Sequence, residues 1–259
     1  MSSCPIGIFD SGVGGISIWK EICSLLPFED TVYLADSKNA PYGPKTKQEI
    51  IDLSIKNTEY LLSKKCKLIV VACNTATTNA IKILRDNFTV PFIGIEPAIK
   101  PASLQTKTNT IGVLATKGTL GSSLFCKTSE RFAKHIHVIE QEGDGIVELI
   151  EEGKLETEAM MQLLKHYIDP MIQNHIDHLV LGCTHYTYLI PLLKKILPDN
   201  VIVITSGPPL AKQVKTVLER EKLLRLSKSQ PQHEFFTNGD TKVIKSILGF
   251  GNTVTYTNF

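Results

Sequence analysis

The sequence predicts an α/β protein made of two pseudo-symmetric domains, each with a parallel sheet, that face each other across a ligand cleft. Two apolar runs, 68–71 and 178–182, each end in a cysteine with a threonine close behind, and a helical pattern follows each. Short β-branched runs of this kind are typical of strands buried on both faces of a parallel sheet. The cysteines therefore lie at carboxyl ends of strands, where such folds bind ligands.

A weak internal repeat supports two domains of similar plan. Three stretches recur at offsets of about 105 to 110 residues: IGIFDSG with IGVLATKGT, IVVACNT with LVLGCTH, and PFIGIEPA with VIVITSGPP. Repeated strand–helix units indicate separate parallel sheets. We expect residues 1–97 to form the first domain and 98–207 the second, with 208–259 packing back on the first.

The strands of the first half alternate with helical patterns, as parallel sheets require. An aspartate and a glycine-rich turn follow the first strand, but the turn lacks the spacing of a nucleotide-binding loop. The elements expected here are strands at 6–9, 31–35, 68–71 and 91–95, and helices from 16, over 48–65 and after Cys73.

The second half repeats this alternation. A Gly-Asp-Gly turn and a long amphipathic pattern separate its second and third strands. The expected strands are 109–114, 136–140, 178–182 and 201–204; helices are expected up to Leu104, up to Glu152, over 157–174, after Cys183 and from Ser206, with some strand at 234–236 and 253–256.

Composition and charge exclude several classes of protein. The chain has 259 residues, of which 42% are hydrophobic and 21% charged, and its net charge of +2 is too small to indicate nucleic acid or a membrane surface as a partner. We see neither a membrane span nor a signal peptide, and expect a cytoplasmic protein. The six cysteines contain no CxxC pair, so we predict neither a metal site nor disulfides.

Polar residues after the strands are candidates for ligand contacts. Asp10 is suited either to an ammonium group or to capping the next helix. Tyr42 and Gly43 lie in a turn held by two prolines and are suited to presenting a hydroxyl and a backbone N–H.

The two cysteines, one from each half, predict a proton-transfer reaction. A single buried cysteine, Cys73 or Cys183, is best explained as a small apolar residue, but two at matched strand ends favour function. Two thiols on opposite sides of a ligand suit removal of a proton from one face of a carbon and return to the other. We expect a helix N-terminus to lower the thiol pKa, so that each thiol can serve as base or acid.

Six motifs, taken together, resemble the glutamate racemases, cofactor-independent enzymes of the aspartate/glutamate racemase superfamily. They cover about four fifths of the chain in the family's order: FDSGVGG, ADSKNAPYG, ACNTAT, GIEPA, GVLAT and LGCTHY. The resemblance implies interconversion of L- and D-glutamate, supply of D-glutamate for peptidoglycan, and a homodimer.

The resemblance also implies roles for individual residues. Cys73 and Cys183 are the expected catalytic bases, with Asp10 and His185 assisting them. Glu151, or else Glu148, matches a further family glutamate, although the surrounding sequence differs from the family pattern. The expected substrate contacts are Asp10, Ser11, Tyr42, Gly43, Asn74, Thr75, Thr116, Thr119, Thr184 and His185.

Other functions remain open at this point. An aspartate or hydantoin racemase would share the paired cysteines, although DSGVGG and PYG resemble the glutamate branch. An amino-acid binding protein would need neither thiol and would leave the α-proton of its ligand in place. A racemase that also binds a regulatory partner is neither indicated nor excluded.

Overall fold

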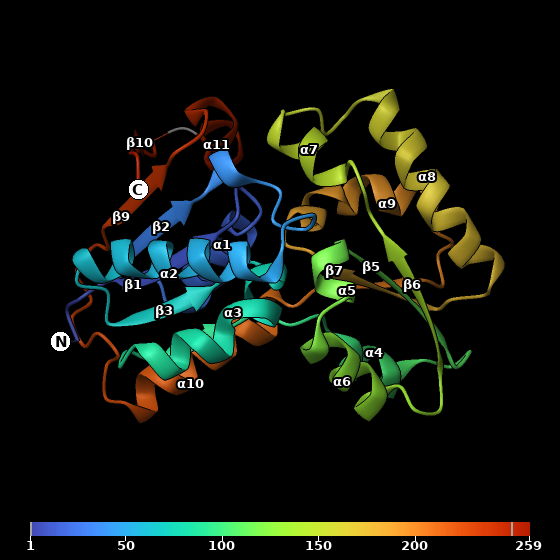
Figure 1. Cartoon of the computed structure of the whole chain (residues 1–259), viewed down its shortest axis with the longest axis horizontal. Coiled ribbons are helices and arrows are strands. Elements are labelled where there is room, and N and C mark those ends of the chain that lie inside the picture. The colour runs from blue at the N-terminus through green and yellow to red at the C-terminus, as the bar shows by residue number, and fades with distance from the viewer. Residues whose placement is uncertain (1, 250) are drawn as a thin grey trace.

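The protein folds into two lobes, each built on a parallel sheet (Figure 1). The structure is a computed structural model that describes residues 2–249 and 251–259. Sheet A contains β1 (Ile6–Asp10), β2 (Thr31–Ala35), β3 (Leu68–Val71), β4 (Phe92–Gly94), β9 (His233–Thr237) and β10 (Val254–Tyr256). Sheet B contains β5 (Thr110–Ala115), β6 (His137–Glu142), β7 (His178–Gly182) and β8 (Ile202–Ile204).

The two sheets share one strand order, as the internal repeat predicts. Sheet A runs β10-β9-β2-β1-β3-β4, and sheet B runs β6-β5-β7-β8, so β2-β1-β3-β4 corresponds to β6-β5-β7-β8. In both sheets the strand that ends in a cysteine lies beside the first strand of its half. The prediction of two parallel-sheet α/β domains is confirmed. The two tail strands extend sheet A beyond β2.

Helices cover both sheets, and most begin where the sequence predicts. Thr46 and Glu49 form a reciprocal capping box at the start of α2, which supplies partners for two unpaired backbone N–H groups. The first lobe carries α1 (Ile16–Leu25), α2 (Lys47–Ser63), α3 (Asn74–Asn87), α10 (Gly207–Arg220) and α11 (Thr241–Leu248). The second carries α4 (Ile99–Gln105), α5 (Lys117–Leu120), α6 (Ser123–Phe132), α7 (Ile146–Glu151), α8 (Glu158–Gln173) and α9 (Ile190–Ile196).

Some local predictions differ from the structure. The helix expected to reach Lys65 ends at Ser63, because Lys65 adopts a left-handed conformation with φ of 59°. After Cys183 the chain first forms a 3₁₀ helix, His185–Leu189, and only then α9. A second 3₁₀ helix spans Ser37–Asn39. The sequence pattern predicts none of the helices α5, α6 and α11.

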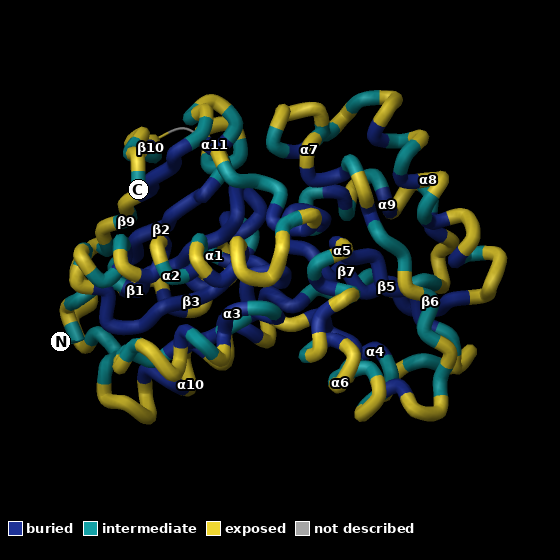
Figure 2. The backbone as a smooth tube through the Cα atoms, in the orientation of Figure 1, coloured by how far each residue is buried: buried dark blue, intermediate teal, exposed yellow. Residues whose placement is uncertain are grey.

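The central strands form the interior of each lobe, and exposed residues lie on the outer helices, the loops and the edge strands β6, β8 and β10 (Figure 2). One apolar cluster crosses between the lobes, joining Val13 and Ile16 of the first to Leu181, Tyr186 and Leu189 of the second. This shared packing brings the carboxyl ends of both sheets toward each other. Within the described residues, no helix is long and apolar enough to cross a membrane.

Candidate active site

Cys73 lies where β3 ends and α3 begins. Its sulfur accepts a hydrogen bond from the backbone N–H of Ala76 at 3.4 Å, and its thiol donates to Ser11 Oγ at 3.6 Å. Burial raises the pKa of this thiol to about 12, and the nearby charge of Asp10 raises it as well. The helix N-terminus therefore does not lower this pKa below the ordinary value, contrary to the sequence prediction, because desolvation outweighs the N–H contact.

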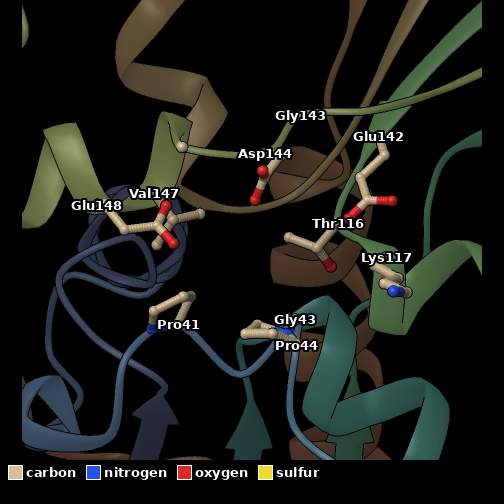
Figure 3. A pocket seen from close by; sticks show the side chains of 11 residues that line it. Pro41, Gly43, Pro44, Thr116, Lys117, Glu142, Gly143, Asp144, Val147 and Glu148 are labelled. Atoms are coloured by element: carbon tan, nitrogen blue, oxygen red, sulfur yellow. The ribbon is translucent and has the colours of Figure 1, made fainter.

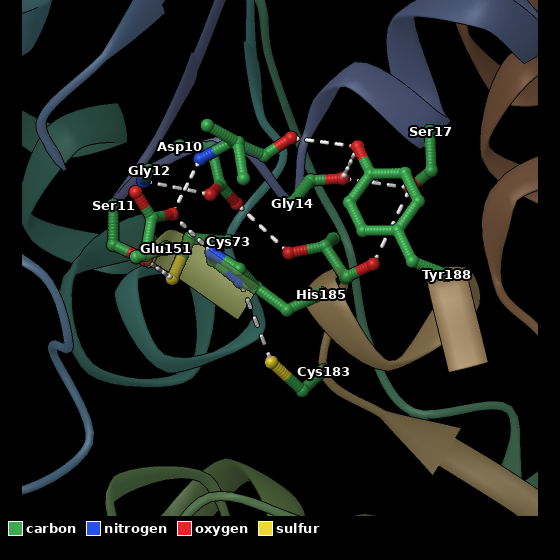
Figure 4. A network of polar contacts seen from close by, with 12 residues as sticks. Asp10, Ser11, Gly12, Gly14, Ser17, Cys73, Glu151, Cys183, His185 and Tyr188 are labelled. Carbon is green, nitrogen blue, oxygen red and sulfur yellow. Dashed lines mark hydrogen bonds and ion pairs between the residues drawn. The ribbon is translucent and has the colours of Figure 1, made fainter. Parts of the chain in front are cut away.

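Cys183 lies at the matching end of β7 with different neighbours (Figure 4). Its sulfur is 3.8 Å from Nδ1 of His185, whose Nε2 is 2.6 Å from Oε1 of Glu151. Burial lowers the pKa of His185, but the hydrogen bonds to Cys183 and Glu151 outweigh burial and hold it well above its ordinary value. The imidazole is therefore held between a sulfur and a carboxylate, and both contacts favour its protonated form.

Asp10 links the two lobes at the end of β1. Its carboxylate accepts from the backbone N–H of Gly12 at 2.9 Å and from the Thr184 hydroxyl of the second lobe, also at 2.9 Å. Burial raises the pKa of Asp10, and the neighbouring His185 opposes this increase. Gly15, not Asp10, is the N-cap of α1. The helix-capping alternative for Asp10 is therefore wrong.

A small cavity between the lobes is lined by both cysteines. Asn74 is buried in its wall, and Nδ2 of that side chain has no hydrogen-bond partner among the described residues. A buried amide donor without a partner is expected to bind a ligand or water. The lining residues are Ser11, Pro41, Tyr42, Gly43, Cys73, Asn74, Thr75, Thr116, Val147, Cys183 and His185.

Three threonine hydroxyls from the two lobes meet at one side of this cavity. Oγ1 of Thr75 in α3 is 2.8 Å from Oγ1 of Thr116 and 3.3 Å from that of Thr119, and the latter two are 3.1 Å apart. We call these three side chains the hydroxyl triangle. All three are buried, and together they offer three O–H donors to an anion.

Tyr42 and Gly43 line the cavity in different ways. The Tyr42 hydroxyl donates to the carboxylate of Asp36 and accepts from Nδ2 of Asn57 at 3.1 Å. It is thus already paired, although the sequence suggested that it would be presented to a ligand. Gly43 lies against Thr116, where an added Cβ would be 3.1 Å from the threonine Cβ.

A second pocket adjoins the first, and Figure 3 shows the residues that line it. Both cavities are lined by Pro41, Gly43, Thr116 and Val147, so these four residues stand between them. Lys117, Glu142, Asp144 and Glu148 line the outer one. We call this space the vestibule, because it shares these lining residues with the cavity that the two cysteines line.

The structure distinguishes between the two glutamates left open by the sequence. Oε1 of Glu151 accepts from the backbone N–H of Val13 at 2.7 Å and contacts the His185 ring. Glu148 is exposed and lines only the vestibule. From the sequence, only the family resemblance bears on the choice between the two glutamates, because the contact of Glu151 with His185 depends on how α7 packs against the first lobe. Tyr188, which donates to the Val13 carbonyl at 2.7 Å, had no sequence signal.

Every residue expected from the sequence to contact substrate lies at or beside the inner cavity. Asp10, Thr119 and Thr184 do not line it directly. Thr119 bonds to Thr75, which lines it, and Asp10 and Thr184 bond to each other and adjoin the lining residues Ser11 and Cys183 in the sequence. Among the described residues, no group of three or more histidine, cysteine or acidic side chains is arranged to hold a metal ion.

Comparison with known proteins places this chain in a family. The sequence profile of the Asp/Glu/Hydantoin racemase family matches residues 21–214. The glutamate racemase of Ectopseudomonas mendocina is 42% identical over 248 residues, which cover 95% of this chain and 94% of that protein. Escherichia coli glutamate racemase, solved in complex with L-glutamate and the activator UDP-MurNAc-Ala, is 32% identical with a TM-score of 0.86, covering 97% of each chain.

A structure with the other enantiomer is also similar. Glutamate racemase from Francisella tularensis, solved in complex with D-glutamate, is 30% identical with a TM-score of 0.81 and covers 95% of this chain and 92% of its own. The chain therefore belongs to the Asp/Glu/Hydantoin racemase family, alongside the glutamate racemases.

Proposed function

We propose that this protein is a cofactor-independent glutamate racemase that interconverts L- and D-glutamate with Cys73 and Cys183 as its two bases. One observation carries the proposal: two cysteines, one from each pseudo-symmetric sheet, line a single cavity. The related enzymes solved with L-glutamate and with D-glutamate support the choice of substrate.

The surroundings of the sulfurs suggest a starting state for each. Cys73 is a protonated thiol in the free enzyme, because its pKa is about 12. Cys183 lies beside a cationic imidazole, which stabilises negative charge on a sulfur. In one direction the Cys183 thiolate takes the α-proton, and the Cys73 thiol then donates its proton to the opposite face of the carbanion. In the reverse direction Cys73 starts as the thiolate and Cys183 as the thiol.

The remaining polar groups would bind substrate and stabilise the carbanion. In this proposal the hydroxyl triangle donates to one carboxylate of glutamate, and Asn74 Nδ2 donates to the other. Asp10, Ser11, Tyr42, Gly43, Thr184 and His185 complete the contacts, with Asp10 nearest the ammonium group. Donors fixed before the reaction in a water-poor cavity favour charge that develops in the transition state.

The test is incubation of the metal-free, pyridoxal-free protein with L-glutamate in D₂O, following the α-proton by NMR together with optical rotation. We expect wild type to lose both signals, and Cys73→Ser and Cys183→Ser to racemise far more slowly. If aspartate or a hydantoin reacts while glutamate does not, the choice of substrate is wrong. If no candidate loses its α-proton, the protein is a binding protein and the thiols are structural.

Three further proposals follow from the family resemblance. The product D-glutamate would supply peptidoglycan synthesis in the cytoplasm. The enzyme would act as a homodimer, and a monomeric mass by light scattering at working concentration would contradict this. Residues 1–97 with 208–259 would form one domain and 98–207 the other.

A further inference from the structure

Asn79 connects the two lobes without lining the cavity. It lies on α3, one turn after Thr75, and its Nδ2 donates to the Thr75 carbonyl at 2.9 Å and to the Gly118 carbonyl at 3.0 Å. Nδ2 is also 3.3 Å from the Thr78 hydroxyl. Thr75 belongs to the first lobe and Gly118 to α5 of the second, so one amide spans the boundary.

The residues of the hydroxyl triangle lie at both ends of this connection. Thr75 supplies one hydroxyl, and Thr116 and Thr119 flank Gly118 and supply the others. Thr116 is the N-cap of α5, yet its side chain makes no capping bond, and its hydroxyl faces Thr75 instead. The spacing of the three hydroxyls therefore depends on how α5 sits against α3.

The contact between α3 and α5 is close at the backbone. A Cβ added to Gly118 would lie 2.8 Å from Cγ2 of Thr75 and 2.9 Å from the carbonyl oxygen of Gly43. Gly118 has no side chain whose packing could fix its backbone, so its position depends on other contacts. The Asn79 amide supplies that hold, because it bonds directly to the Gly118 carbonyl.

Substrate binding makes this hydrogen bond more important. A carboxylate bound at the hydroxyl triangle takes the O–H hydrogens that now join Thr75 to Thr116 and Thr119. Among the described residues, the bond from Asn79 to Gly118 is then the side-chain hydrogen bond still joining α3 to α5.

We propose that Asn79 is a positioning residue that sets the width of the hydroxyl triangle and thereby the affinity for the substrate carboxylate. This inference rests on the proposed racemase function. Asn79 touches neither the sulfurs nor the cavity, so it acts on binding more than on proton transfer.

Steady-state kinetics of Asn79→Ala and Asn79→Asp test the proposal. Asn79→Ala removes the amide, and Asn79→Asp keeps the size but places acceptor oxygens against two carbonyls. We expect KM for glutamate to rise about tenfold in Asn79→Ala and at least as much in Asn79→Asp, with kcat within about twofold of wild type. Asn174→Ala is the matched control, because Asn174 also donates to the carbonyl four residues before it, at 2.8 Å, and is the exposed C-cap of α8.

Hydrogen exchange of the unliganded protein gives a readout that does not depend on activity. We expect faster exchange of the amides of residues 119–121 in Asn79→Ala, and no change in Asn174→Ala. An unchanged KM in Asn79→Ala would overturn the proposal. So would an equal loss of kcat for L-glutamate and for D-glutamate at constant KM. If wild type fails to racemise glutamate, the proposed function fails, while the exchange data still show whether Asn79 holds α5.

Discussion

The two catalytic candidates are the same residue type in matched positions, yet their surroundings differ. Cys73 contacts a serine hydroxyl and one backbone N–H in the first turn of a helix, whereas Cys183 contacts an imidazole. The pseudo-symmetry of the sheets therefore extends to the positions of the sulfurs but not to their electrostatics. Under the proposed mechanism, this difference makes the two thiols unequal as acids in the free enzyme.

The charge on His185 depends on Glu151. Since burial alone would lower the His185 pKa, we expect Glu151→Gln to move it down toward or below its ordinary value. The imidazolium would then be lost at a lower pH, and the alkaline limb of kcat/KM would move in the same direction. Titration of the ring nitrogens of His185 by NMR measures the shift.

Glu148→Gln is the control for this prediction. It removes a carboxylate from the same helix, α7, at an exposed position with no hydrogen bond to His185 among the described contacts. An equal shift in both variants would mean that the overall charge of α7, not the contact to Glu151, sets the His185 pKa.

At the scale of elements, a buried charge precedes the cysteine strand in each lobe. Lys67 comes just before β3, and its Nζ donates to the Ser2 carbonyl at 2.7 Å and to Glu29 at 2.5 Å. Asp177 comes just before β7 and accepts from the backbone N–H of Thr108 at 3.0 Å. The two charges are opposite, but each holds the segment that leads into the first strand of its lobe.

The Lys67–Glu29 pair permits a stability test. Both side chains are almost fully buried, so Lys67→Met leaves a buried carboxylate without its cation. We expect this to lower the free energy of unfolding by about 3–5 kcal/mol, and Glu29→Gln in the same chain to recover part of the loss. Urea denaturation measures both. Lys154→Met, which breaks an exposed pair with Glu152, should change stability by less than about 1 kcal/mol.

The sequence predicted the strands and the sulfur positions well, because buried parallel strands are uninterrupted apolar runs and the repeat shows them twice. It did not reveal α6, although Ser122 caps its start, nor the 3₁₀ helix after Cys183, which no side-chain cap marks. It also missed the contacts across the lobes, such as those of Asn79 and Tyr188. Those contacts depend on how the lobes pack, which no local pattern specifies.

The whole molecule has its two lobes in close contact around the inner cavity, and glycines make that contact possible. A Cβ on Gly12 would lie 1.9 Å from Oε1 of Glu151, and one on Gly14 would lie 2.4 Å from Nδ1 of His185. Neither glycine has a positive φ, so what these positions require is space. The glycine-rich turn after β1 is therefore explained by the approach of the second lobe and not by a phosphate.

Gly14→Ala tests whether closure of the lobes is needed for activity. The added methyl group would also meet Oγ1 of Thr184 at 2.7 Å, so His185 and Thr184 must move away from the first lobe. Because a displacement of about 1 Å at a reacting group lowers rates about 100-fold, we expect kcat/KM to fall by that order. Each lobe keeps its own sheet, so far-ultraviolet circular dichroism should be unchanged. Gly121→Ala is the control, since the nearest atom to its Cβ is a carbonyl oxygen at 3.4 Å. Wild-type kcat/KM in Gly14→Ala would show that activity does not depend on this close contact between the lobes.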